Sequence, residues 1–199
     1  LKNPAQDVSN HMGTLVRLHL DGSIPDDNPF VGQEDAKPEI WSYGHRNVQS
    51  LAFHPETGEL WEAEFGPLGG DELNRIAPGT NYGWPEVSWG SNYDGSPIPD
   101  PPTRPEFTDA VREWSPVISP SGMIFYTGTT FPEWTGSLFI SSLSQQGLVR
   151  LVIDGGEVTH EEMIPLGVRI RDVAQGPDGH LYVATDLGNG AVWRLSPVE

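Results

Sequence analysis

One pattern recurs along the chain and restricts it to a small group of folds. Its first half is an apolar strand, a turn with Pro followed by Gly, and a second apolar strand, at residues 50–61, 115–126 and 172–183. Pro presets the backbone for the start of the turn, and Gly supplies the positive φ that completes it. Its second half is a short strand that ends in Arg and an aliphatic residue, at residues 14–18, 72–76, 147–151 and 191–195. The pattern predicts a series of similar antiparallel sheets.

A unit of strand, turn, strand and strand with about 45–65 residues has the size of one β-propeller blade. We therefore predict an all-β fold in which residues 1–199 form one partial β-propeller domain of four-stranded blades, with about three to three and a half blades present. An open arc of blades would expose two strand edges. We therefore expect further N-terminal blades outside this chain, or a second chain that completes the ring. A β-sandwich with a chance similarity of hairpins is the alternative.

The composition agrees with short strands and disfavours several kinds of partner. Gly 23 and Pro 19 fit many strands joined by tight turns. A formal net charge of −17 repels a phosphate backbone, so no nucleic-acid partner is expected. Cys is absent, which excludes a disulfide framework and a thiolate metal site. No apolar run reaches the roughly 18 residues that a membrane-spanning helix needs.

Three stretches carry candidate binding groups. Arg46 offers a planar fork of donors for a carboxylate, and Asn47 adds an amide. Residues 64–72 are rich in Gly and end in two acidic residues, and exposed carbonyls beside carboxylates suit a hard cation such as Ca²⁺. Arg169 and Arg171 would point to one face of an extended strand and suit a small polyanion. The simpler alternatives are a surface pair, a blade turn and a charge ladder with acidic neighbours.

Four motifs, taken in their order along the chain, resemble those of the soluble aldose sugar dehydrogenases of the glucose/sorbosone dehydrogenase family. The matching motifs are Gly-His-Arg-Asn at 44–47, Gly-Pro-x-Gly-Gly-Asp-Glu at 66–72, Asn-Tyr-Gly-Trp-Pro at 81–85 and Arg-Ile-Arg-Asp-Val at 169–173. The resemblance extends over essentially the whole chain. It implies the C-terminal part of a propeller with an expected six blades, roughly twice this length. It also implies pyrroloquinoline quinone (PQQ) and Ca²⁺ as cofactors.

The resemblance implies roles for individual residues. It places Gly66 and Pro67, through their carbonyls, at the Ca²⁺ that polarises PQQ, and Glu72 and Tyr82 at a second, structural Ca²⁺. PQQ is a tricarboxylate, which paired arginines and a cation would suit. No catalytic residue is expected in this chain, because the family's general-base His lies in the N-terminal part. The residues implied at the cofactor are Arg46, Asn47, Tyr93, Ser142, Leu143, Ser144, Arg169 and Arg171.

The resemblance therefore implies an oxidoreductase, periplasmic or extracellular, that passes hydride from C1 of an aldose to PQQ and forms a lactone. The preferred sugar and the electron acceptor stay open. The alternative is a non-catalytic propeller that acts as a carbohydrate- or protein-binding module. Phe65, Leu68 and Ser144 motivate it, because the family usually has His, Arg and Lys there. Lactone hydrolysis is disfavoured, since the sequence shows no convergent set of carboxylates.

Overall fold

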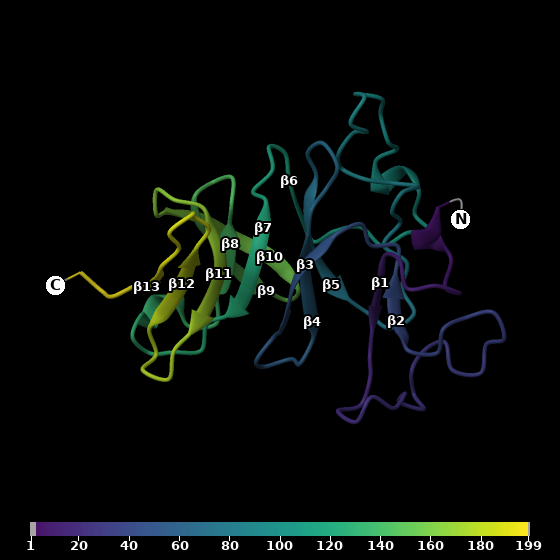
Figure 1. The fold of residues 1–199 in the computed structure, drawn as a ribbon, viewed down its shortest axis with the longest axis horizontal. Helices are drawn as coiled ribbons and strands as arrows, with labels where there is room; N and C mark the ends of the chain where they lie inside the picture. Colours follow the sequence, from purple (N-terminus) through teal and green to yellow (C-terminus); the bar gives the residue numbers. More distant parts are fainter. Residues whose placement is uncertain (1–2, 199) are drawn as a thin grey trace.

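The computed structural model describes residues 3–198 and is built from β-strands. The strands form four antiparallel sheets in chain order, and no α-helix occurs in the described part (Figure 1). Three one-turn 3₁₀ helices lie in the segments outside the strands, η1 (Pro4–Gln6), η2 (Pro101–Thr103) and η3 (Pro132–Trp134). Within residues 3–198, no helix has the length and apolar character that crossing a membrane requires.

Each sheet is a meander in which consecutive strands pair. The first sheet pairs β1 (Thr14–Val16) with β2 (Ile40–Tyr43). The second contains β3 (Val48–Phe53), β4 (Leu60–Glu64), β5 (Asp71–Ile76) and β6 (Arg112–Trp114). The third contains β7 (Pro120–Phe125), β8 (Leu138–Ser142), β9 (Gly147–Asp154) and β10 (Glu157–Pro165). The fourth contains β11 (Ile170–Gln175), β12 (Leu181–Thr185) and β13 (Val192–Arg194).

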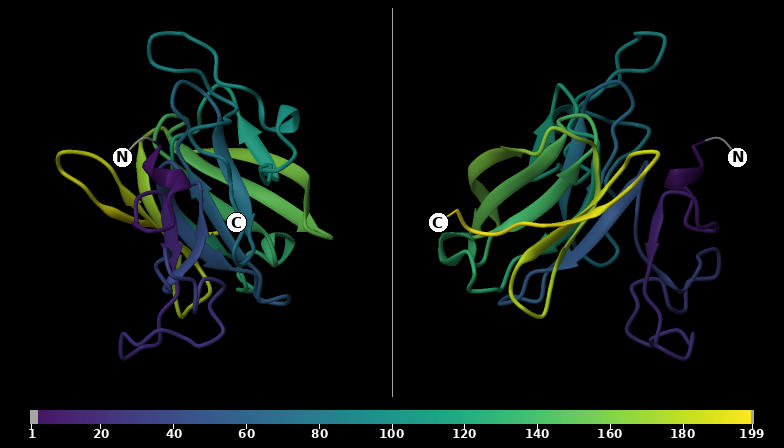
Figure 2. Two further views of the ribbon diagram at one scale, coloured as in Figure 1. Left: turned by 90° about the vertical axis from the view of Figure 1, so that its right-hand side faces the viewer. Right: turned by 60° about the vertical axis from the view of Figure 1, so that its left-hand side comes forward.

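The first strands of successive sheets lie against one another, β3 against β7 and β7 against β11. The sheets thus follow one another along the molecule, with the N- and C-terminal segments at opposite ends (Figures 1 and 2). The predicted all-β fold and four-stranded sheets are confirmed. The β-sandwich alternative is wrong, because four small sheets are present in place of two large ones.

Alternation along the strands explains where the two cores lie. On β8, Leu138 and Ile140 point into the core between the second and third sheets, where they meet the fully buried Trp61. Phe139 between them points into the core between the third and fourth sheets, beside Tyr126. Side chains alternate between the two faces of a strand. The third sheet is therefore buried on both faces, and its strand β8 is buried throughout.

The repeat is confirmed at two of its three predicted turns. Gly58 and Gly179 lie between paired strands with φ of 72° and 77°, as a turn glycine should. The turn predicted at residues 120–122 is wrong, because these residues lie inside β7. A Cβ on Gly122 would meet Asp172 of β11 at 1.8 Å. This glycine therefore serves the close approach of two sheets rather than a reversal of the chain.

Candidate functional site

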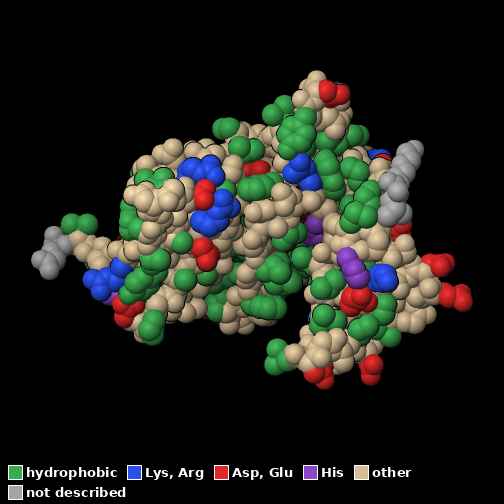
Figure 3. All heavy atoms as spheres, viewed as in Figure 1, with side chains coloured by type: hydrophobic (Ala, Val, Ile, Leu, Met, Phe, Trp, Pro, Cys, Tyr) green, Lys and Arg blue, Asp and Glu red, His purple; other side chains and the backbone are tan. Residues whose placement is uncertain are grey.

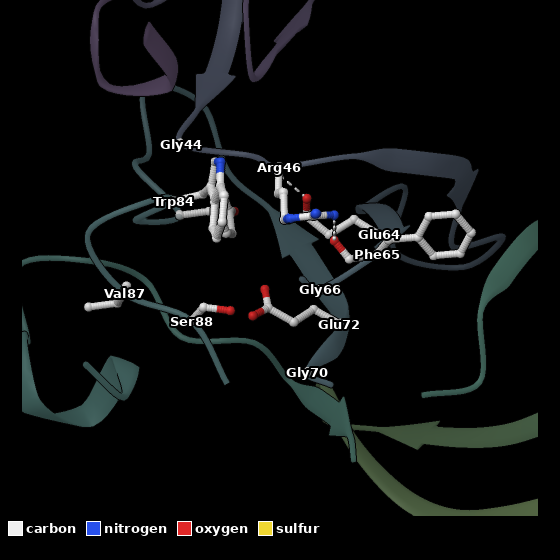
Figure 4. A pocket seen from close by; sticks show the side chains of 11 residues that line it. Gly44, Arg46, Glu64, Phe65, Gly66, Gly70, Glu72, Trp84, Val87 and Ser88 are labelled. Carbon is white, nitrogen blue, oxygen red and sulfur yellow. Dashed lines mark hydrogen bonds between the residues drawn. The ribbon is translucent and has the colours of Figure 1, made fainter. Parts of the chain in front are cut away.

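The loop at residues 44–47 presents Arg46 at a pocket beside the ends of β4 and β5 (Figure 4). The Arg46 guanidinium donates to the Phe65 carbonyl at 3.2 Å and to the Tyr93 hydroxyl at 3.0 Å. Its Cζ also lies 5.2 Å from the ring centroid of Trp84, within the range of a cation–π contact. The structure thus brings Arg46 and Tyr93 together. Asn47 is exposed beside them, and its side-chain oxygen accepts from Gln49 Nε2 at 2.8 Å.

A buried acidic cluster lies behind this loop, and the sequence did not reveal it. Glu62 and Glu64 lie two residues apart on β4 and therefore point to the same face of the sheet. Their cross-strand neighbours on β5 are Asn74 and Glu72. His45 covers the cluster, with its Nδ1 3.6 Å from Glu62 Oε1 and 3.5 Å from Glu64 Oε1. The carboxylates of Glu62 and Glu64 therefore both face the His45 imidazole, and Glu72 is the cross-strand neighbour of Glu64. The expectation that no carboxylates converge was wrong.

Hydrogen bonds and stacking fix the members of the cluster. Asn74 Nδ2 donates to Glu62 at 2.8 Å and to Glu72 at 3.3 Å. His45 Nε2 lies 2.8 Å from the Ser42 hydroxyl, and the His45 ring stacks on Tyr82 with centroids 4.7 Å apart. The His45 ring is therefore held between Ser42, Tyr82 and the two carboxylates.

Burial and mutual repulsion shift the pKa values of the cluster. Burial alone would lower the pKa of His45, but the Glu62 and Glu64 carboxylates raise it to about 10. Burial, reinforced by Glu64, raises the pKa of Glu62 to about 7 and that of Glu72 well above its usual value. Glu64 keeps a lowered pKa despite its burial, because His45 and two backbone N–H groups stabilise its charge. His45 and Glu64 thus form an ion pair, Glu62 approaches the same His45 nitrogen, and no ion pair is found for Glu72 among the described residues.

The cluster fits a bound divalent cation. Within the described residues, Glu62 Oε2 and Asn74 Oδ1 are buried side-chain oxygens without a hydrogen-bond donor. A buried acceptor normally finds a partner, and oxygen atoms of this kind are the ligands that Ca²⁺ prefers. Within the pocket, the carboxylate of Glu72, a member of the cluster, points toward the Ser88 hydroxyl (Figure 4). Glu72 is therefore the predicted metal ligand that the structure supports best.

The other predicted metal residues lie around the same pocket. Gly66 lines it, and a Cβ there would meet the carbonyl oxygens of Gly69 and Gly70 at 2.1 and 2.2 Å. Pro67 follows in the same loop and packs against the Gly90 backbone. The Tyr82 hydroxyl donates to the Arg75 carbonyl at 2.7 Å and accepts from the Ala77 backbone N–H, and burial raises its pKa to about 12. The Tyr82 hydroxyl is thus bonded to two main-chain groups around the end of β5.

Residues 142–144 are connected to the glycine-rich loop at 66–72 through hydrogen bonds to residues 117–119. Ser142 is buried, with its hydroxyl bonded to the Ile118 carbonyl, and the Leu143 backbone N–H donates to the Ser119 carbonyl at 3.1 Å. The Ser119 backbone N–H in turn donates to Asp71 at 2.7 Å, beside the glycine-rich loop. Ser144 is exposed and bonds the Val117 carbonyl at 2.9 Å. Of these three predicted cofactor residues, only Ser144 has an exposed side chain.

Arg169 and Arg171 converge as their spacing predicted, at the start of β11. Arg169 donates to Asp186 Oδ2 at 2.7 and 2.9 Å, and Arg171 donates to the same oxygen at 3.1 Å. The two guanidiniums hold the pKa of Asp186 below its usual range. Asp186 was not predicted, although the sequence places it directly after β12. Within the described part of the chain, no hydrogen bond joins this pair to the Arg46 pocket.

Known proteins share both the sequence and the fold. The family model for glucose/sorbosone dehydrogenase matches residues 1–194. The aldose sugar dehydrogenase YliI of Escherichia coli is 44% identical over 199 residues, which cover 97% of this chain and 53% of the relative. The crystal structure of the soluble aldose sugar dehydrogenase from Escherichia coli in the apo-form matches with a TM-score of 0.90 and 42% identity, over 99% of this chain and 58% of that one.

A cofactor-bound structure is also similar. The PQQ-bound form of an aldose sugar dehydrogenase from Streptomyces coelicolor has a TM-score of 0.75 and 30% identity, and it covers 96% of this chain and 54% of that one. The chain thus spans about half the length of the curated relatives and solved structures that it matches, which is consistent with a C-terminal part. The family resemblance drawn from the motifs is confirmed: the chain belongs to the glucose/sorbosone dehydrogenase family.

Proposed function

We propose that the chain is the C-terminal part of a PQQ- and Ca²⁺-dependent dehydrogenase that oxidises aldose sugars at C1 to lactones. The observation that carries this proposal is the pocket at Arg46. Gly66, Glu72 and Tyr82 line it together with Arg46, whose guanidinium is bonded to Tyr93. The family membership and the similarity to aldose sugar dehydrogenases, one of them bound to PQQ, support the same reaction class.

The residues of this chain would hold and orient the cofactor. PQQ would accept the hydride, and Ca²⁺ would act as a Lewis acid on it. Arg46 supplies a positive charge at the pocket. Arg169 and Arg171, which share Asp186, carry one net positive charge that suits a carboxylate. The carbonyls of Gly66 and Pro67 and the carboxylate of Glu72 are the proposed oxygen ligands for the metal. The proton acceptor is expected in the N-terminal part of the full-length protein.

Reconstitution of the full-length protein tests the reaction. With PQQ and Ca²⁺ together we expect aldose-dependent reduction of an artificial electron acceptor, and with either omitted we expect the rate to fall to background. Sugar binding without dye reduction would instead support the binding-module alternative that Phe65, Leu68 and Ser144 motivated. Fractionation of the cells tests the predicted periplasmic or extracellular location in the same preparation.

We further propose that the sheets are blades of a propeller that additional strands complete. β1 pairs with β2 as β5 pairs with β6 and β9 with β10, so the first sheet corresponds to the outer half of a blade. An apolar groove lies beside it, where the two inner strands of that blade would fit. Its lining includes Leu15 and Val16 of the first sheet and Leu51, Phe53 and Leu60 of the second. Figure 3 shows hydrophobic side chains around a hollow between these two parts of the molecule.

Leu51→Ala tests this packing in the full-length protein. Leu51 is 47% exposed in the structure. If nothing covered this surface in the full-length protein, Leu51→Ala would lower the free energy of unfolding only slightly. If two further strands of the full-length protein fill the groove, the substitution is expected to lower the free energy of unfolding by about 2 kcal/mol. Met163→Ala, at a 38% exposed position on the outer strand β10, is the matched control and is expected to cost less than about 0.5 kcal/mol. Equal effects in denaturant titrations would contradict the proposed blade.

A further inference from the structure

The Glu64 carboxylate is attached to the backbone of the loop that presents Arg46. Its Oε2 accepts from the backbone N–H of Arg46 at 2.7 Å and from that of Asn47 at 2.9 Å. Both predicted cofactor residues are therefore held by one oxygen atom at the end of β4. Charge-assisted bonds of this kind are stronger than bonds between neutral groups.

The surroundings of Glu64 keep that oxygen in place. Glu64 is only 4% exposed, and its second oxygen, Oε1, lies 3.5 Å from His45 Nδ1. His45 precedes Arg46 in the same loop and is itself bonded to Ser42 on β2. The loop is thus fixed to β4 through its main chain at residues 46 and 47 and through the side chain of residue 45.

The same strand end also directs the side chain of Arg46. The carbonyl of Phe65, which follows Glu64, accepts from the guanidinium at 3.2 Å (Figure 4). The backbone and the side chain of Arg46 are therefore oriented by two consecutive residues. A shift of the loop would change the direction of the guanidinium and of the neighbouring Asn47 amide.

We infer that Glu64 is a positioning residue: it orients Arg46 and Asn47 toward the anionic cofactor without touching the cofactor itself. This inference rests on the proposed function, because it takes PQQ as the ligand of Arg46 and Asn47. In this inference, the Glu64 side chain acts on the cofactor site through the backbone N–H groups of Arg46 and Asn47. Preorganised donors of this kind bind a ligand without the cost of ordering the loop.

The test compares three variants of the full-length protein by calorimetric titration with PQQ in the presence of Ca²⁺. Glu64→Ala removes both backbone hydrogen bonds and is expected to weaken PQQ binding by about 10-fold or more. Glu64→Gln keeps one acceptor oxygen and is expected to restore most of the affinity, to within about 3-fold of the unchanged protein. Gln175→Ala is the matched control, because Gln175 Oε1 also holds two consecutive backbone N–H groups, those of Thr127 and Gly128, at 2.8 and 2.9 Å on another sheet.

Hydrogen exchange gives a second readout that does not depend on the cofactor. The amide protons of Arg46 and Asn47 are expected to exchange about 10-fold faster in Glu64→Ala than in the unchanged protein, and no faster in Gln175→Ala. Unchanged exchange at these two amides, or PQQ affinity that falls equally in Glu64→Ala and Gln175→Ala, would overturn the positioning role. If the unchanged protein binds no PQQ, the proposed function fails instead, and the exchange rates alone decide whether Glu64 orders the loop. If Glu64→Ala does not fold, Glu64→Gln carries both measurements: its neutral acceptor is weaker, so exchange at the two amides is expected to be about 3-fold faster, and unchanged exchange would overturn the positioning role.

Discussion

Addition of Ca²⁺ to the metal-free full-length protein is expected to raise its free energy of unfolding by about 4 kcal/mol when the ion is present at roughly 1,000 times its Kd. The reason is the charge of the cluster behind the Arg46 loop. Glu62 and Glu64 share the His45 imidazole, and Glu72 is the cross-strand neighbour of Glu64. Two buried oxygens of the cluster lack donors in the described part of the chain. A cation that binds only the folded protein would compensate this excess of negative charge. Thermal unfolding with Ca²⁺ and with a chelator measures the difference.

The pH dependence of the metal-free protein follows from the same groups. The pKa of Glu62 rises from 4.5 to about 7 on folding, so the folded state binds a proton that the unfolded chain releases between these values. Stability is therefore expected to fall as pH rises from about 4.5 to about 7. The pKa of His45 rises from 6.5 to about 10 on folding, so the stability that its protonation contributes is lost as pH rises from about 6.5 to about 10. Stabilisation by Ca²⁺ should thus be larger at pH 8 than at pH 5.

A variant pair identifies the carboxylate that binds the ion. Glu72→Gln is expected to remove most of the response to Ca²⁺, because it removes the lining carboxylate that is not already paired with His45. Glu59→Gln is the control, since Glu59 lies at the hairpin before β4 and pairs only with the exposed Arg75 among the described residues. An equal response to Ca²⁺ in Glu72→Gln and in the unchanged protein would show that the cluster is not the metal site.

The repeat predicted sheets better than it predicted turns. Gly58 and Gly179 occupy turns as expected, because the local sequence alone determines a tight turn. Gly122 resembles them in sequence, but it lies in β7 against Asp172, a contact between two sheets that no local pattern contains. The order of the strands was therefore predictable, whereas the role of a particular glycine depended on the packing of neighbouring sheets.

The site shows the same division between local and distant information. The convergence of Arg169 and Arg171 follows from alternation along one strand, but their partner Asp186 comes from the chain after β12. On β4, Glu62 and Glu64 alternate with the core residues Trp61 and Ala63, a pattern that predicts carboxylates facing water. The loop with His45 covers that face and buries them, which only the folded chain reveals.

Replacement of both arginines at the start of β11, Arg169→Ala with Arg171→Ala, is expected to weaken PQQ binding by at least about 100-fold. A hydrogen bond to a charged group contributes about 1.5–3 kcal/mol, and two such donors would be lost. Both guanidiniums are about half exposed and share a single carboxylate, so the pair carries one uncompensated positive charge. Asp186→Asn is expected to act in the opposite direction and to tighten PQQ binding by about 3-fold, because it frees both donors.

Two controls separate this effect from loss of charge or of stability. Arg112→Ala removes another partly exposed arginine, paired with Glu161 at 2.7 Å between β6 and β10, and is expected to leave PQQ affinity unchanged. Because the Asp186 pairs are exposed, these variants are expected to leave the free energy of unfolding almost unchanged. Calorimetric titrations at two salt concentrations test the charge argument, since screening should weaken binding to the unchanged protein more than to the double variant. If the double variant binds PQQ as tightly as the unchanged protein, the carboxylates of the cofactor are held elsewhere and β11 carries only a surface ion pair.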